Sequence, residues 1–211
     1  MRIRAVTPEL LVTELAARIA AAPPDRWVRV ALDGAPAAHP DRLAADLVAP
    51  LRALGRPTLR VSAADFLRPA SLRYEFGRTD PDSYYQDWLD IKGLNREVLD
   101  PLAEGGTGRV VRALWDAAAD RATRTPYEVL APGTVVLVDG ALLLGQGLSF
   151  DLAVHLWLSP GALARRTPEG ERWTLPAFAR YDEEVGPASF ADLVVRVDDP
   201  RHPAVFSPLG A

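Results

Sequence analysis

Cysteine is absent from the 211 residues, which excludes a disulfide framework, a thiolate nucleophile and a cysteine metal site. A cysteine-free chain fits a reducing cytoplasm, where we expect this protein. The formal net charge of −4 gives no electrostatic reason to bind nucleic acid or a membrane surface. Long apolar runs are also missing, since Glu14 and Arg18 interrupt the one near the N-terminus. We therefore expect neither nucleic acid nor a membrane among its partners.

Lysine is almost absent as well. Lys92 is the only lysine, so arginine supplies nearly all of the positive charge. Codon bias in a GC-rich genome accounts for this composition, because Ala, Arg, Gly, Pro, Leu and Asp are all abundant. The scarcity still bears on function, because lysine is the compact charge that phosphate-binding loops normally use.

The hydrophobic pattern predicts one layered domain over residues 1–211, which is long enough to bury a sizeable core without disulfides or metals. Short apolar strands alternate with amphipathic helices along the chain. This alternation predicts an α/β fold with a mostly parallel sheet and with ligands at the carboxyl ends of its strands. The strands are expected at 27–32, 58–61, 109–114, 134–138, 153–158 and 193–197, and the helices at 8–22, 40–54, 94–102 and 177–185.

Residues 28–43 have the layout of a phosphate-binding loop and lack its chemistry. An apolar strand pattern ends at Gly34 and a helical pattern follows, as in the G-x-x-x-x-G-K-S/T unit that cradles nucleotide phosphates. The second glycine, the lysine and the hydroxyl of that unit are here His39, Pro40 and Asp41. Proline has neither charge nor N–H, and a carboxylate repels phosphate, so we expect ATP to bind weakly or not at all. The candidate phosphate-loop residues are Asp33, Gly34, His39 and Asp41.

Three aspartates follow predicted strands and are expected at one edge of the sheet, namely Asp33, Asp65 and Asp139. Asp139 stands where a carboxylate orients Mg²⁺ in nucleotide-binding proteins, or it caps the following turn. Asp65 accepts a proton from a substrate hydroxyl, or it is the N-cap of a short helix beginning at Phe66. The residues alone leave both pairs of alternatives open.

The order of several short motifs resembles the uridine kinase and phosphoribulokinase-like branch of P-loop kinases. The resemblance runs from about residue 27 to residue 200, and it is nearest to an actinobacterial-type uridine kinase-like group. Residues 30–34 (VALDG) resemble the first strand and loop, and 62–66 (SAADF) the second-strand motif. Residues 79–84 (TDPDSY) resemble the D-x-P-D-A/S-F/Y segment, and 138–140 (VDG) stand where the family has an E-G pair. The lid pair and the closing strand correspond to 163–166 (LARR) and 191–195 (ADLVV).

This resemblance implies a three-layer P-loop NTPase-like domain with a short lid at about 160–176. It also implies transfer of the γ-phosphoryl group of ATP or GTP, with Mg²⁺, to the 5′-hydroxyl of a pyrimidine nucleoside. In that picture Asp65 is the base, Asp139 organises Mg²⁺, and Arg165 and Arg166 gather the transferring phosphoryl group. Ribose hydroxyls would be bound by Asp80 or Asp82, and the base would be enclosed by Tyr84, Tyr85 and Trp88.

The same residues also have plainer interpretations. Arg165 and Arg166 suit a solvated helix face, and Asp80 and Asp82 suit a turn onto which the aromatic residues pack. Arg68 replaces an aromatic residue of typical uridine kinases. With Arg73 and Arg78 it forms a positive segment, which fits either an anionic ligand or a plain arginine surface.

Two classes of function follow. The first is a phosphotransferase in which other groups replace the loop lysine, and the second is a non-catalytic relative that binds a ligand or regulates. The ligand expected in either class is a small nucleoside, nucleotide or sugar-type molecule, and a homo-oligomer is left open. The histidine-free segment 121–124 contributes Arg124, and the candidate substrate-binding residues are Arg68, Asp80, Asp82, Tyr84 and Arg124.

Overall fold

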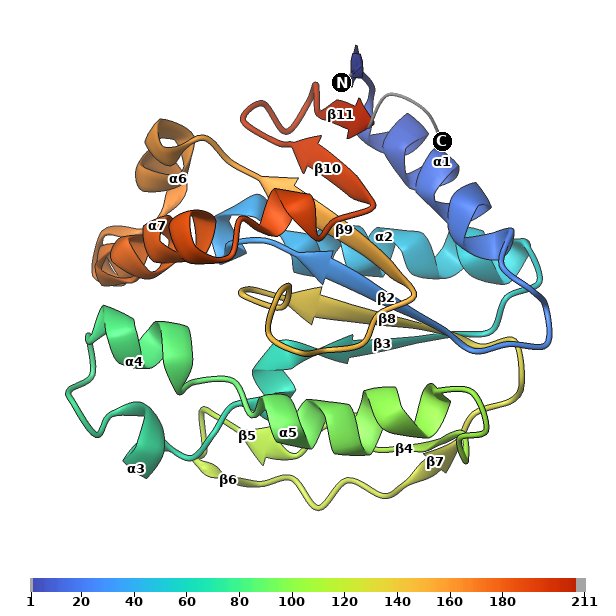
Figure 1. Cartoon of the computed structure of the whole chain (residues 1–211), viewed down its shortest axis with the longest axis horizontal. Coiled ribbons are helices and arrows are strands. Elements are labelled where there is room, and N and C mark those ends of the chain that lie inside the picture. The colour runs from blue at the N-terminus through green and yellow to red at the C-terminus, as the bar shows by residue number, and fades with distance from the viewer. Residues whose placement is uncertain (1, 208–211) are drawn as a thin grey trace.

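The computed structural model describes residues 2–207, which form a seven-stranded sheet between helical layers (Figure 1). The strand order is β1-β11-β10-β9-β2-β8-β3, and the strands from β10 to β3 run parallel. The mostly parallel sheet predicted from the sequence is confirmed. The bounds are β1 Arg2–Ala5, β2 Val28–Asp33, β3 Thr58–Ser62, β8 Val135–Gly140, β9 Leu152–Trp157, β10 Leu193–Arg196 and β11 Ala204–Ser207.

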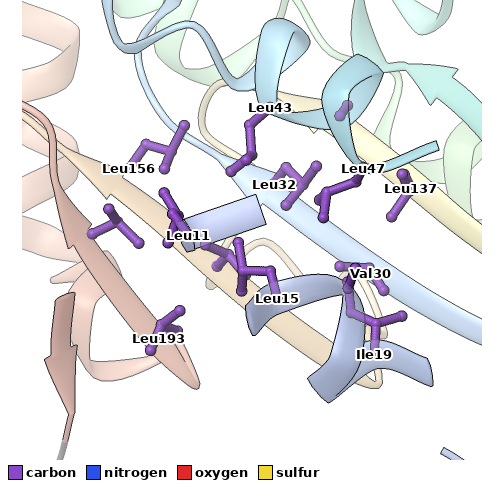
Figure 2. Close-up of a cluster of buried hydrophobic side chains, with 14 of the residues drawn as sticks. Leu11, Leu15, Ile19, Val30, Leu32, Leu43, Leu47, Leu137, Leu156 and Leu193 are labelled. Carbon is purple, nitrogen blue, oxygen red and sulfur yellow. The ribbon is translucent and has the colours of Figure 1, made fainter. Parts of the chain in front are cut away.

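Two helices cover one face of the sheet. Helix α1 spans Pro8–Ala20 and α2 spans Pro40–Ala53. The predicted apolar stripe of α1 is confirmed, because Leu11, Leu15 and Ile19 are all buried against the sheet (Figure 2). Burial of this stripe holds α1 beside α2 on the sheet. Because α2 begins directly after the phosphate-loop region, that region lies at the carboxyl edge of β2.

The opposite face is covered by a helical segment that changes its pitch. Helix α5 spans Ile91–Leu94 and continues as a π-turn over Asn95–Leu99 and a 3₁₀ turn over Asp100–Leu102. The predicted helix over 94–102 is therefore helical but not a regular α-helix. Pro101 explains part of this, since it cannot donate to the Glu97 carbonyl, which instead accepts the amide of Val111 at 3.1 Å.

Short elements extend beyond this layer. The strands β4 (Arg109–Val110) and β7 (Glu128–Val129) pair with each other, as do β5 (Trp115–Asp116) and β6 (Arg121–Ala122). The strand expected at 109–114 is thus only two residues long.

The remaining helices gather at the carboxyl ends of the parallel strands (Figure 1). These are α3 Ala70–Arg73, α4 Pro81–Gln86, α6 Pro160–Arg166 and α7 Leu175–Glu184, with a 3₁₀ turn at Glu169–Thr174 between the last two. The expected lid region at 160–176 corresponds to α6 and this turn. Within residues 2–207, no helix combines the length and apolar character needed to cross a bilayer.

Candidate functional site

A cavity of about 460 Å³ opens at the carboxyl edge of β2, β3 and β8. One part of its wall is the phosphate-loop region, and another is the turn that follows β8. The largest part is aromatic and aliphatic and comes from the segment around α4. Its polar lining includes His39, Asp41, Asp139, Gln146 and Glu171, and its larger apolar lining includes Leu67, Tyr84, Tyr85, Trp88, Leu89 and Ile91.

The phosphate-loop region is folded on itself. Residues Pro36–Ala38 form a 3₁₀ turn in which the amide of Ala38 donates to the Ala35 carbonyl at 2.8 Å. The next amide, that of His39, donates to the Pro36 carbonyl at 3.0 Å. Pro36 and Pro40 have no amide hydrogen at all. Several donors that such a loop would aim at a phosphate are therefore engaged or missing.

The backbone at His39 nevertheless has the conformation of the glycine that it replaces. Its φ of 57° and ψ of 52° lie in the left-handed region, which a non-glycine residue adopts at a cost. The imidazole is exposed and lies 3.9 Å from the Asp41 carboxylate. Gly34 is required for a different reason, because a Cβ there would lie 2.9 Å from the Leu156 carbonyl oxygen. The backbone of the loop therefore keeps the conformation of the motif at His39 and the close approach at Gly34.

Asp33 is a buried anchor and not a lining residue of the cavity. Its carboxylate accepts the Leu143 amide at 2.9 Å and the Tyr181 hydroxyl at 3.3 Å, and it lies 2.7 Å from Nδ1 of His155. The Tyr181 hydroxyl also accepts the amide of Leu144 at 2.8 Å. Asp33 thereby joins the end of β2 to the turn after β8, to β9 and to α7. Sequence reasoning missed both partners, because a histidine in an apolar strand and a tyrosine in a helix carry no signal of such a contact.

Asp139 forms a bidentate ion pair with Arg60 of β3. The Nε and Nη2 atoms of Arg60 donate to its two carboxylate oxygens at 2.6 and 3.1 Å. Asp139 is buried, whereas the arginine side chain is 36% exposed. Hydrogen bonding to Asp139 raises the pKa of Arg60, and the charges of Asp41 and Asp65 add to the effect. The sequence analysis did not single out Arg60, although an arginine inside a short strand with apolar neighbours is a usable signal.

Asp65 lies in a 3₁₀ turn, Ala63–Phe66, directly after β3. Burial raises the pKa of its carboxyl, the nearby charge of Asp139 raises it further, and Arg60 acts in the opposite direction. The N-cap of this turn is Ser62 and that of α3 is Pro69, so Asp65 is not the N-cap of a helix beginning at Phe66. Asp65 is not itself among the cavity-lining residues of the described chain, but its neighbours Ala64 and Leu67 are. A half-buried carboxyl with a raised pKa has the environment of a general base.

The expected substrate-binding residues are spread over several environments. Asp80 is the N-cap of α4, where it accepts the Ser83 amide at 2.6 Å, and the exposed Asp82 pairs with Arg180 at 2.9 Å. Tyr84 lines the cavity, and burial raises its pKa to about 12. Arg124 has a φ of 55° in the segment after β6 and is not among the cavity-lining residues of the described chain.

Two arginines of the positive segment expected near Asp65 are engaged within the protein, whereas the third, Arg78, is exposed. Arg68 pairs with Asp87 at 2.8 Å. Arg73 is buried, donates to the Arg68 carbonyl at 2.7 Å and stacks on Tyr74 and Trp88. These arginines therefore hold the wall of the cavity together.

The two lid arginines have different surroundings. Arg166 donates to the carbonyls of Val197 and Asp198, both at 2.8 Å, and so ties α6 to the end of β10. It also lines a second cavity, of about 550 Å³, between the lid and the phosphate-loop region. Arg165 is exposed.

Two solved structures share this arrangement of elements. One is a possible uridine kinase from Bacillus stearothermophilus, with a TM-score of 0.70, 20% identity, and coverage of 87% of this chain and 96% of that one. The other is a fructose transport system kinase candidate from a Silicibacter species, with a TM-score of 0.55, 23% identity, and coverage of 88% and 92%. The fold is the three-layer α/β fold of P-loop NTPase-like domains, as the sequence predicted. No protein-family model and no curated protein matches the sequence.

A P-loop kinase fold implies a nucleotide and Mg²⁺, and the residues present fit the metal poorly. Both carboxylate oxygens of Asp139 already accept hydrogen bonds from a guanidinium that stays charged. A second cation would be repelled there at close range. Among residues 2–207, no three histidine or acidic side chains form a group able to hold a metal. The metal role expected for Asp139 remains a prediction that this arrangement disfavours.

Proposed function

We propose that this chain is a uridine kinase-like phosphotransferase, which moves the terminal phosphoryl group of ATP or GTP to a hydroxyl of a small ring-bearing acceptor. One observation carries the proposal. It is the half-buried carboxyl of Asp65, whose pKa is raised, in the turn after β3 between Ala64 and Leu67, which line the 460 Å³ cavity. The P-loop kinase fold supports it, because ligands of such sheets lie at this edge.

Asp65 has the role of general base in this proposal. As the acceptor oxygen bonds to the terminal phosphorus, its proton passes to the Asp65 carboxylate, and the bond from phosphorus to the nucleoside diphosphate breaks. Arg60 lies close enough to influence the pKa of Asp65 and is the cation paired with the neighbouring Asp139. Arg165 is the exposed lid cation available to the transferring group, whereas Arg166 is tied to backbone carbonyls.

The walls of the cavity favour an uncharged acceptor. Tyr84 and Trp88 pack edge to face with ring centroids 5.0 Å apart and offer flat apolar surface to a ring. The acidic lining residues Asp41, Asp139 and Glu171 would repel a phosphate on the acceptor. A nucleoside or a related hydroxylated ring is therefore a better acceptor than a nucleotide.

A second candidate function, favoured by the loop, is ligand binding without transfer. The inward hydrogen bonds of Ala38 and His39 and the proline at position 40 weaken the grip on a nucleotide. The largest part of the cavity wall comes from the segment around α4 and not from the altered loop, so an acceptor-binding protein could keep it. We also infer a cytoplasmic location, which rests on the cysteine-free composition alone.

A phosphoryl-transfer assay across a panel of acceptors tests the proposal. ATP and GTP are each offered with nucleosides, nucleoside monophosphates and sugars, with and without Mg²⁺, and phosphorylated products are detected by mass spectrometry. Product from at least one uncharged acceptor is expected, in preference to its monophosphate. Binding of an acceptor in calorimetry without any product would support the ligand-binding candidate instead.

A further inference from the structure

Arg60 is the cation paired with the cavity-lining carboxylate of Asp139. Its side chain projects from β3 to Asp139 at the end of the neighbouring strand β8, where Ser62 and Asp139 are in register. Two of its nitrogens are used by Asp139, at 2.6 and 3.1 Å. The side chain is only partly buried, whereas its partner Asp139 is buried.

The charges of two further carboxylates act on the same guanidinium. Asp41 stands in the first turn of α2, where the phosphate-loop motif has the hydroxyl that binds a metal ion. Asp65 stands beyond the end of β3, and Arg60 opposes the rise in its pKa. One fixed cation thus contacts Asp139 and also feels the charges of Asp41 and Asp65, in a group of carboxylates of the kind that holds a divalent ion in a metal-dependent site.

We propose that the Arg60 guanidinium takes the place of a divalent metal ion, so that this site is built to work without one. The inference goes beyond phosphoryl transfer, because it holds equally for a ligand-binding protein. Its physical basis is that arginine does not lose its proton in proteins and that its planar fork matches both oxygens of Asp139. A cation that is part of the chain does not have to be bound from solution, and its charge repels a metal ion.

The protein contains a matched control for this pair. Arg29 of β2 binds Asp151 in the same bidentate way, with Nε to Oδ2 at 3.0 Å and Nη2 to Oδ1 at 2.8 Å. The only other side chain that influences the pKa of Asp151 is Arg26, a cation. Removal of Arg29 therefore also breaks a bidentate ion pair. It leaves the single carboxylate of Asp151, whereas removal of Arg60 leaves a group of carboxylates.

The experiment compares the full-length protein with Arg60→Ala and Arg29→Ala. Melting temperatures are measured with EDTA, Mg²⁺ or Mn²⁺, and bound Mn²⁺ is counted by electron paramagnetic resonance. The parent is expected to bind no Mn²⁺ and to melt at one temperature in all three conditions. Arg60→Ala is expected to melt lower in EDTA, to bind about one Mn²⁺ and to recover roughly 3–6 °C at ten times the dissociation constant of the ion. Arg29→Ala should melt lower with no recovery by metal.

Two results would overturn the proposal. The first is a parent that binds Mn²⁺ and loses it in Asp139→Asn, since the site would then hold a metal beside Arg60. The second is an Arg60→Ala protein that gains no more metal response than Arg29→Ala. If Arg60→Ala does not fold, Arg60→Gln carries the same expectation, and Arg60→Lys, which keeps the charge, should stay unresponsive to metal.

Discussion

At the scale of single residues, the proposed chemistry depends on Asp65 and Arg60. Asp65 is half-buried in the turn after β3, and Arg60, which pairs with Asp139, also influences the pKa of Asp65. Both side chains belong to the β3 region, although the charge of Asp41 in the altered loop also acts on Arg60. The proposed acceptor site and the phosphate-loop region therefore share the wall of one cavity.

The raised pKa of Asp65 leads to a pH prediction. A base must be ionised, so turnover should fall on acidification with a midpoint above the ordinary aspartate value of 3.8. The folded state also binds this proton more tightly than the unfolded chain does. Stability should therefore fall as the pH rises from the unfolded pKa through the folded one. Titration of the Asp65 carboxyl by NMR, with Asp65→Asn as the control, checks the midpoint, and a value at or below 3.8 would contradict the environment described here.

Gly34 gives a prediction on packing. In Gly34→Ala the new Cβ would meet the Leu156 carbonyl oxygen at 2.9 Å and the Leu156 Cβ at 3.1 Å, so β2 and β9 would have to separate. The melting temperature should drop by several degrees, as for other overpacked core positions that lose about 1–3 kcal/mol. Gly170→Ala is the matched control, since nothing lies within 4 Å of its Cβ position and its φ is not positive. Equal melting of both variants would refute the close approach.

At the scale of elements, the phosphate-loop region keeps the left-handed backbone conformation at position 39 but differs from the motif in the side chains at positions 39–41. Replacement of His39, Pro40 and Asp41 by Gly, Lys and Thr should relieve the left-handed strain, supply the missing charge and restore an amide. Affinity for ATP in calorimetry should rise by at least tenfold over the parent, whereas His39→Gly alone should change it little. No gain in the triple variant would mean that the 3₁₀ turn at Pro36–Ala38 blocks the phosphate position.

The buried contact between α7 and the turn after β8 predicts a loss of stability in Tyr181→Phe. That change leaves the Leu144 amide without its acceptor at 2.8 Å and removes a donor to Asp33. The cost should be about 1–3 kcal/mol in the free energy of unfolding, measured by denaturant titration. Tyr127→Phe is the control, because its hydroxyl bonds Glu97 at an exposed site and its loss should cost less. Equal losses of unfolding free energy in the two variants would contradict the claim that the buried hydroxyl of Tyr181 stabilises the fold more than an exposed one does.

The sequence predicted the central elements well because their signals are local. Apolar β-branched runs gave the strands at 135–138 and 193–196, and a four-residue spacing gave the buried face of α1. The strands β1 and β11 were not predicted, because each is only four residues long and β1 forms only by pairing with β11 at the other end of the chain. The partners of Asp33 and Asp139 were missed for the same reason, since His155 and Arg60 lie far from them in the chain.

At the scale of the whole molecule, the sheet brings separate segments to one edge. The carboxyl ends of β2, β3 and β8, the α4 segment and the lid region meet around cavities of about 460 and 550 Å³. The shared fold with two solved kinase-like structures agrees with this placement of ligands. The proposed phosphoryl transfer depends on the part of this edge that follows β3, where Asp65 lies.

Phosphoryl transfer by the parent and by Asp65→Asn, assayed on the same acceptors with thermal melts alongside, tests this account most directly. The substitution keeps size and hydrogen bonding but removes the base, so turnover should fall by roughly 10² to 10⁴. Asp65 caps no helix, so the melting temperature should change little. Full activity in Asp65→Asn, or no transfer by the parent to any acceptor, would contradict the claim that this chain is a phosphotransferase with Asp65 as its base.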